Sequence, residues 1–306
     1  MIVVITGGTG LVGQALIKKL IQAKHTVYNI TRKLRNPKLA GYREFLWPEC
    51  SDKFPMEAFP TKESYGVINL AGEPVSIWPW TKKRKEKIYS SRVNRSQQLV
   101  SAFKENPPQF FISASAIGIY GDQGDQTITE ESDKPGQNLF LQKVCLDWEE
   151  SALRATSISR TVIFRFGIVL SYKKGFLYEQ SKWIKKGCLP FVFSFKEHWL
   201  SWISIEDLTS LILWAVQNEN TRGVYNAVSS QPVSLRRFYF VLKKQYKSAW
   251  LPLIQIPAPL FLLKRAGGEM FQNLLMSSRV LPAKALSEGF VFKQKDLETA
   301  LKQKNC

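Results

Sequence analysis

A run of eight residues near the amino terminus has the composition of a phosphate-binding turn. It reads Thr6-Gly7-Gly8-Thr9-Gly10-Leu11-Val12-Gly13 and lies between an apolar run and a helical pattern. Gly7 or Gly8 allows the tight bend, Gly10 lets the backbone approach a pyrophosphate, and Gly13 lets the helix pack closely on the sheet. The helix start offers free amides and partial positive charge to phosphate oxygens. This context predicts a dinucleotide site that includes Gly7, Thr9, Gly10, Leu11, Val12 and Gly13.

A basic turn follows the next apolar run. Where an acidic residue would bind the ribose hydroxyls of NAD, the sequence reads Thr31-Arg32-Lys33, and no Asp or Glu occurs between Val27 and Ala40. A guanidinium can pair bidentately with a 2′-phosphate and stack on adenine. Thr31 and Arg32 therefore favour NADP(H) over NAD, although a solvated basic turn would look the same in a basic protein.

The elements that must position these residues alternate between strands and helices. Strand patterns cover Met1 to Ile5 and Thr26 to Ile30, with a helix from about Leu11 to Ala23 between them, which is a βαβ unit. Further elements are predicted as strands at 67–70, 109–114 and 161–165 and as helices at 82–103 and about 139–155. The fold class is α/β: a Rossmann, doubly wound parallel sheet with a smaller C-terminal α+β substrate domain.

The domain division is expected where the pattern changes after Leu170. Residues 1–170 would form the NADP(H)-binding Rossmann domain, with a returning segment at about 203–228, and residues 171–306 the smaller domain. The strand-like run from Gly223 to Val228 is expected to return to the sheet, so the boundary is discontinuous.

Composition narrows the class of protein. The 306 residues carry 44% hydrophobic and 22% charged side chains, which is typical of a folded chain, and a formal charge of +18. The four cysteines form no CxxC pair, and the amino terminus lacks the pattern of a signal peptide, so we expect a reducing, cytoplasmic setting. The apolar stretches 208–216 and 249–263 are too short or too broken by proline to span a membrane.

Motifs spread along the whole chain resemble one branch of the extended short-chain dehydrogenases, the atypical YfcH-like or SDR39U1-like epimerase-family proteins. The matching stretches are Asn69 to Pro74, Trp80-Thr81 with Lys85 to Val93, Ser115 to Gly121, Phe140-Leu141 with Val144-Cys145 and Trp148-Glu149, Arg165 to Leu170, Trp202-Ile203 with Asp207, and Val280 to Pro282 with Gly289-Phe290. Two stretches differ from the group: Ser204 stands where it has His, and Phe191 to His198 replaces a glycine-rich segment.

The resemblance implies further cofactor contacts. Leu70, Ala71 and Gly72 would line the adenosine and phosphate side, Arg92 would reach the phosphate or ribose region, and Val169 would lie near the nicotinamide. Leu70 as a core residue and Arg92 as an exposed helical charge are the alternatives.

The same resemblance draws attention to a missing catalytic pair. Active members use a Tyr whose phenol exchanges the substrate proton and a Lys one helical turn later. The corresponding positions are Leu141 and Cys145, and nearby Lys143 points about 100° or more away on the helix. Ser115 and Tyr120, or water, are the candidates for the proton transfer, the alternative for Ser115 being a hydroxyl bonded to a neighbouring backbone group.

Metal and thiol chemistry are not indicated. Cys145 could be a nucleophile or redox switch, but neither His25 nor His198 is placed to assist it, and a buried structural Cys is the more common case. No cluster of His, Cys and carboxylates has the spacing of metal ligands.

The basic run Lys82-Lys83-Arg84-Lys85-Glu86-Lys87 opens a helix beside Trp78 and Trp80. Basic residues among aromatics can bind single-stranded nucleic acid. Charge at a helix start also opposes the helix dipole, which indicates a ligand phosphate or compensation elsewhere. Such runs are more often solvated faces, so nucleic acid is an unfavoured partner.

Three functions remain open from the sequence. The chain is an NADP(H)-dependent oxidoreductase or epimerase acting on an unidentified, sugar-like small molecule, a non-catalytic NADP(H)-responsive regulator, or a basic nucleic-acid-associated protein. A homodimer is compatible with each.

Overall fold

A computed structural model of the chain describes residues 1–35, 37, 39–134, 139–186, 198–246 and 276–302. The chain folds into two compact units. The first contains Met1–Ser115, Val144–Phe164 and Thr209–Tyr225, and the second contains Ala116–Lys143, Arg165–Leu208 and Asn226–Cys306. The division expected at about residue 170 stays a prediction.

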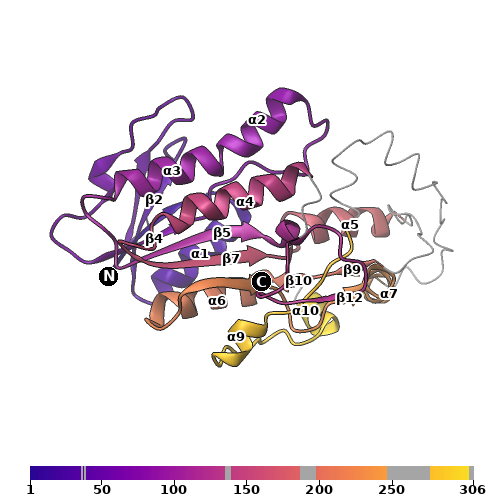
Figure 1. Ribbon diagram of the computed structural model, residues 1–306. Helices are drawn as coiled ribbons and strands as arrows, with labels where there is room; N and C mark the ends of the chain where they lie inside the picture. The colour runs from indigo at the N-terminus through magenta and orange to yellow at the C-terminus, as the bar shows by residue number, and fades with distance from the viewer. Residues whose placement is uncertain (36, 38, 135–138, 187–197, 247–275, 303–306) are drawn as a thin grey trace. The chain divides into compact units, whose positions relative to one another are not determined.

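A mostly parallel sheet organises the fold (Figure 1). Within the described residues its strands are β1 (Ile2–Thr6), β2 (Thr26–Thr31), β3 (Tyr42–Leu46), β4 (Tyr65–Asn69), β5 (Phe110–Ala116), β7 (Arg160–Phe166) and β11 (Gly223–Ala227). The strand order is β11-β7-β5-β4-β1-β2-β3, and the pairings among β1 to β5 are parallel. Chain order therefore runs away from β1 on both sides, which puts a topological switch point between β1 and β4.

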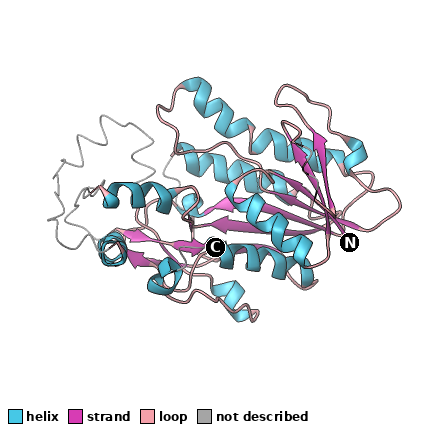
Figure 2. Cartoon of the chain, turned by 180° about the vertical axis from the view of Figure 1, so that it is seen from behind, coloured by secondary structure: helices cyan, strands magenta, loops and turns pink. Residues whose placement is uncertain are grey.

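Helices cover both faces of this sheet (Figures 1 and 2). They are α1 (Leu11–Gln22), α2 (Lys82–Ser90), α3 (Val93–Ala102), α4 (Phe140–Leu153) and α6 (Ile205–Gln217). The helices α1 and α6 lie side by side, because Lys19 Nζ donates to Ser210 Oγ at 2.5 Å. This arrangement confirms the doubly wound fold predicted from the βαβ pattern.

The sheet is buried because its central strands are apolar on both faces. Every residue of β1 and β4 is buried. One face packs against α3 and the end of α4 through a cluster that includes Val4, Val67, Leu99, Phe103 and Ala152. A parallel strand that is covered on both faces requires a continuous apolar run, so these strands could be predicted from the sequence.

Two elements differ from the sequence-based expectation. The helix expected over 82–103 is two helices, because the chain breaks at Ser91 and Arg92, where Arg92 takes φ −107° and ψ −62°. The strand β3 was not expected, since its sequence Tyr42-Arg43-Glu44-Phe45-Leu46 is charged and it forms the edge of the sheet. Edge strands need less apolar sequence than central ones.

The second unit has its own apolar core around Trp202, Phe238 and Leu297. Its short strands pair as β8 with β10, β9 with β12, and β6 with β13. The other elements of this unit are β6 (Thr127–Ile128), β8 (Ile168–Leu170), β9 (Trp199–Leu200), β10 (Trp202–Ser204), β12 (Val233–Ser234), β13 (Arg279–Val280), α5 (Phe176–Lys185), α7 (Leu235–Gln245), α9 (Ala283–Ser287), α10 (Leu297–Lys302) and the 3₁₀ turn η2 (Ile117–Tyr120). The 3₁₀ turn η1 (Met56–Ala58) belongs to the first unit.

A buried carboxylate fastens the C-terminal segment within this unit. Asp207, which is 1% exposed, accepts hydrogen bonds from the backbone amides of Lys293 and Gln294, both at 2.9 Å. The hydroxyl of Ser204 accepts from the Asp207 amide and so caps the start of α6. Asp207 therefore has a structural role here.

Among the helices built from described residues, none is long and apolar enough to cross a membrane. The apolar stretch 249–263 lies outside the described residues, as do Cys188, Cys306 and most of the divergent segment before His198.

We predict that Asp207→Ala lowers the free energy of unfolding by about 3 kcal/mol, because it leaves two backbone amides without their acceptor. Urea denaturation monitored by circular dichroism measures this change. Asp133→Ala is the matched control, since it removes an exposed carboxylate from the same unit. Equal stability of the two variants would contradict the anchoring role of Asp207.

Candidate cofactor-binding and active site

The glycine turn lies at the carboxyl end of β1 and leads directly into α1. Gly7 has φ +74°, and a Cβ there would stand 2.4 Å from the carbonyl oxygen of Leu70, so the tight bend belongs to Gly7. The amide of Gly10 closes the turn by donating to Gly7 O at 3.0 Å.

Gly10 and Gly13 differ in how closely the protein packs around them. A Cβ on Gly13 would clash with Gly7 O at 2.4 Å, which is close packing within the protein. A Cβ on Gly10 would have its nearest neighbour, Gly7 O, at 3.2 Å. Packing therefore explains Gly13 but only weakly explains Gly10, whereas a pyrophosphate resting on this backbone needs Gly10. No acidic residue occurs in the first turn of α1.

A buried amide side chain holds the turn against β4. Asn69 Oδ1 accepts from the Thr6 hydroxyl at 2.6 Å and from the Ala71 amide at 3.3 Å, and Asn69 Nδ2 donates to Ser96 Oγ at 2.7 Å. Asn69 thus joins β1, the loop after β4 and α3. In the sequence analysis Asn69 is named only as part of a motif. The feature that could have identified it is a polar residue at the end of an otherwise apolar strand.

Arg92 lies beside the loop after β4, and its contact with the phosphate or ribose of a cofactor stays a prediction. Its guanidinium carbon is 3.0 Å from a Cβ placed on Gly72, so any larger residue at position 72 would collide with it. The guanidinium also lies 5.4 Å from the Trp148 ring centroid and donates to Ile88 O at 3.2 Å. Burial lowers the pKa of Arg92, against the opposing influence of Cys145 and Glu73. The structure therefore brings Leu70, Ala71, Gly72 and Arg92 together in the first unit.

Arg32 projects from the turn after β2, with 63% of its side chain exposed. Its Nη1 is 2.5 Å from Glu73 Oε1 and 3.6 Å from Glu49 Oε2. The hydroxyl of Thr31 shapes this turn, because it accepts from the Lys33 amide at 3.4 Å. The sequence had placed Arg32 but not the two carboxylates that meet it.

Ser115, at the end of β5, is 2% exposed and donates to Glu149 Oε1 at 2.7 Å. Glu149 lies on α4 and is 5% exposed. The partner of the Ser115 hydroxyl is therefore a buried carboxylate rather than a neighbouring backbone group. In the sequence, Glu149 is marked only as the last residue of a motif.

Tyr120 belongs to a buried cluster in the second unit. Its hydroxyl donates to Asn226 Oδ1 at 2.8 Å and accepts from Arg165 Nη1 at 2.6 Å, and all three side chains are at most 1% exposed. Burial raises the pKa of Tyr120, and Arg165 opposes this shift. The hydroxyl therefore keeps its proton at neutral pH.

The helix α4 carries Leu141, Cys145 and Glu149 at intervals of four residues. Cys145 is 5% exposed, and Lys143 is exposed. Val169 lies in β8, where it is opposite Ile203 of β10, and its role near the nicotinamide stays a prediction. The described part of the chain has no group of three or more His, Cys, Asp or Glu arranged to hold a metal ion.

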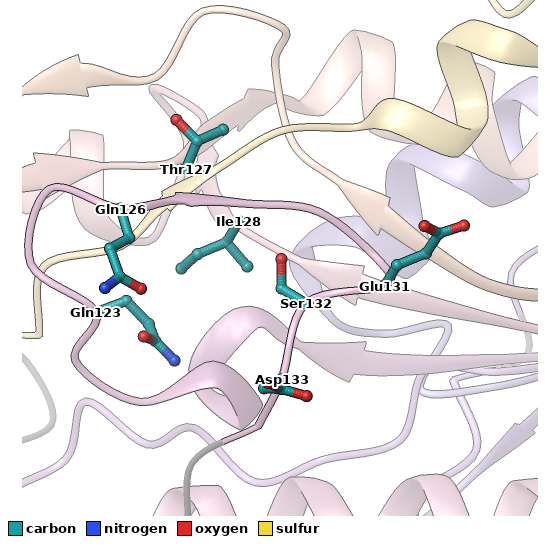
Figure 3. Close-up of a pocket in the computed structure, with 7 residues that line it drawn as sticks. All are labelled: Gln123, Gln126, Thr127, Ile128, Glu131, Ser132 and Asp133. Carbon is teal, nitrogen blue, oxygen red and sulfur yellow. The ribbon is translucent and has the colours of Figure 1, made fainter.

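A polar pocket of about 340 Å³ lies in the second unit, in the loop that follows Tyr120 (Figure 3). Its lining consists mainly of amide, hydroxyl and carboxylate side chains: Gln123, Gln126, Thr127, Ile128, Glu131, Ser132 and Asp133. Such groups donate and accept hydrogen bonds and therefore suit a hydroxylated ligand.

We predict that Gly7→Ala and Gly10→Ala affect stability very differently. Gly7→Ala puts a side chain into a left-handed conformation and against Leu70, which should cost about 2 kcal/mol or more. Gly10→Ala should cost less than about 1 kcal/mol, since it changes only the residue that precedes the helix. Thermal denaturation of both variants measures the difference, and a larger loss for Gly10→Ala would mean that packing already requires this glycine.

Comparisons with known proteins agree on one family. Residues 3–227 match the NAD dependent epimerase/dehydratase family, and residues 258–303 match a domain of unknown function, DUF1731. The epimerase family protein YfhF of Bacillus subtilis is 33% identical, over 99% of this chain and 97% of that protein. The chloroplastic SDR39U1 homolog of Arabidopsis thaliana is 30% identical, over 99% and 86%.

Two solved structures have similar folds. The human epimerase family protein SDR39U1 with NADPH has a TM-score of 0.82 at 22% identity, covering 99% of this chain and 98% of that one. A nucleoside-diphosphate sugar epimerase from Corynebacterium glutamicum has a TM-score of 0.74 at 29% identity, covering 98% and 57%. The matched family model and the similarity over the full length of its relatives make this chain a member of the NAD dependent epimerase/dehydratase family, as its resemblance to the epimerase-family short-chain dehydrogenases predicted.

Proposed function

We propose that this protein binds NADP(H) and uses it to oxidise, reduce or epimerise a small, sugar-like hydroxylated compound. The observation that carries the proposal is the glycine turn of Gly7 to Gly13, which lies at the head of α1 and at the switch point of the sheet. Ligands of doubly wound sheets bind at such switch points.

The residues around the turn fit the dinucleotide. The amides of Leu11, Val12 and Gly13 at the start of α1 would hold the pyrophosphate, because the first amides of a helix have no partner within it. The backbone of Leu70 and Ala71 would line the adenosine side, with Arg92 behind it.

Arg32 supports NADP(H) over NAD(H). Its guanidinium is exposed after β2 and would take the 2′-phosphate. The human family member of similar fold was solved with NADPH, which favours the same cofactor here.

Ser115 and Glu149 offer a route for the substrate proton. Bound NADPH would supply a hydride while the substrate oxygen gains a proton, and bound NADP+ would accept a hydride while the substrate hydroxyl loses its proton. In the oxidising direction, the Ser115 hydroxyl could accept the proton of the substrate hydroxyl while it passes its own to Glu149 Oε1 at 2.7 Å. Tyr120 remains the second candidate, as a protonated phenol held by Arg165 and Asn226.

The substrate class rests on the polar pocket and on the family. Amide and hydroxyl groups line the pocket after Tyr120. One similar structure is of a nucleoside-diphosphate sugar epimerase. A hydroxylated, sugar-like compound is therefore the proposed substrate.

A non-catalytic NADP(H)-responsive role is the second proposal. It is favoured by Leu141 and Cys145 on α4, which by the family resemblance stand where active extended members have Tyr and Lys. Binding of nucleic acid by the basic run, cytoplasmic location and a homodimer stay predictions.

We predict that NADPH raises the melting temperature of the protein more than NADH does, because a ligand that binds only the folded state stabilises it by mass action. Arg32→Gln should abolish this difference while it leaves a shift with NADH. Arg43→Gln, which removes an exposed charge from β3, is the control. A wild-type protein that neither cofactor stabilises would contradict the proposal.

We further predict that NADPH is oxidised with a member of a panel of carbonyl compounds and sugar nucleotides, followed by its absorbance. Ser115→Ala and Glu149→Gln should lower kcat by about 100-fold or more with little change in NADPH binding. Ser113→Ala is the matched control, because it removes a buried hydroxyl of the same strand that donates to the backbone, at Ala114 O. Tight NADPH binding without turnover on any compound would favour the non-catalytic role instead.

A further inference from the structure

The carboxylate of Glu73 bridges two arginines in the first unit. Its Oε1 is 2.5 Å from Arg32 Nη1, and its Oε2 is 3.1 Å from Arg84 Nη1. Glu73 follows β4, Arg32 follows β2, and Arg84 lies in the first turn of α2. Three separate segments therefore converge on one anionic group.

The two arginines differ in how firmly they are held. Arg84 is 15% exposed, and one of its terminal nitrogens donates to Pro74 O. Its backbone amide also donates to the capping hydroxyl of Thr81 at 3.2 Å. Arg32 is 63% exposed and shares its contact between Glu73 and Glu49. Arg84 is thus the fixed arm of the pair, and Arg32 is the movable arm.

Glu73 is charged in this position. Burial acts to raise its pKa, but the hydrogen bonds and charges of Arg32 and Arg84 outweigh burial and hold the pKa below its usual value. The Glu73 amide donates to Ser91 Oγ at 3.0 Å, which holds the backbone at this position against the end of α2.

The paired guanidiniums have more donors than one carboxylate uses. Within the described residues, Arg84 Nε is buried without an acceptor. A phosphate monoester carries nearly two negative charges and three acceptor oxygens, so it satisfies such a pair better than a carboxylate does. Phosphate and carboxylate cannot share the site without strong repulsion.

We propose that Arg32 and Arg84 together form the site for the 2′-phosphate of the dinucleotide, and that Glu73 occupies this site until the phosphate displaces it. The proposal rests on the proposed NADP(H) binding and adds two things to it. Arg84 becomes a second phosphate ligand, and Glu73 becomes a residue that sets cofactor specificity.

The proposal predicts the direction in which the affinity for a 2′-phosphate changes when the charge of Glu73 is removed. Because Glu73 must leave, it lowers the apparent affinity for a 2′-phosphate and leaves a dinucleotide without that phosphate unaffected. Removing its charge should therefore tighten binding of one ligand class alone. A merely structural ion pair would give no such selectivity.

The test uses adenosine 2′,5′-bisphosphate and adenosine 5′-monophosphate as probes, with dissociation constants from isothermal titration calorimetry on the full chain. Arg84→Gln should weaken binding of the bisphosphate by about 10-fold and binding of the monophosphate by less than about 2-fold. Glu73→Gln should strengthen binding of the bisphosphate several-fold and leave binding of the monophosphate unchanged. Lys83→Gln, which removes an exposed charge from the neighbouring position of α2, should change neither by more than about 2-fold.

Arg84→Lys is a control for a folding defect, because it keeps the positive charge but loses the paired N–H donors of the guanidinium. This variant should bind the bisphosphate with an affinity between those of the wild type and Arg84→Gln. Equal effects of Arg84→Gln on both probes, or weaker bisphosphate binding in Glu73→Gln, would overturn the two-arginine site while cofactor binding stands. A wild-type protein that does not prefer the bisphosphate would instead overturn the NADP(H) preference itself.

Discussion

The site depends on the buried amide of Asn69. This side chain ties the end of β1, through Thr6, to the loop after β4 and to Ser96 on α3. The glycine turn, the adenosine-side loop and the helix that carries Arg92 therefore keep a fixed relation to one another. An apolar residue at position 69 would leave several buried polar groups unpaired at the point where the ligand has to be held. Precise placement of backbone amides is what phosphate binding requires, because each amide contributes only in a narrow range of directions.

Much of this architecture could be predicted from the sequence, for a clear physical reason. Strands covered on both faces are continuously apolar, so β1, β4 and β5 were recognisable, and the switch from strand to helix around Gly7 located the turn. The strand β3 was missed because an edge strand needs no such pattern. The break between α2 and α3 was missed because Ser91 and Arg92 are ordinary helix residues, and the break depends on tertiary contacts with the loop after β4.

The residues of the candidate site were less predictable than the elements. The glycines and Arg32 could be proposed because their types and positions are constrained locally, whereas Arg92 was proposed only from the family resemblance. Arg84 was hidden in a run of basic residues, where only its spacing of four from the buried Ile88 marked the face that turns inward. Glu149 and Glu73 could not be assigned, since their roles depend on partners distant in sequence, Ser115 on β5 and Arg32 after β2.

The cluster around Tyr120 has a consequence for how this sequence can diverge. Its hydroxyl accepts from Arg165 and donates to Asn226, and the Asn226 amide in turn donates to Leu281 O at 3.0 Å. Loss of the single oxygen in Tyr120→Phe would strand a buried guanidinium donor and an amide acceptor at once. Sequences that diverge from this one can therefore replace the three side chains readily only together. Positions 120, 165 and 226 are expected to co-evolve whether or not the phenol takes part in catalysis.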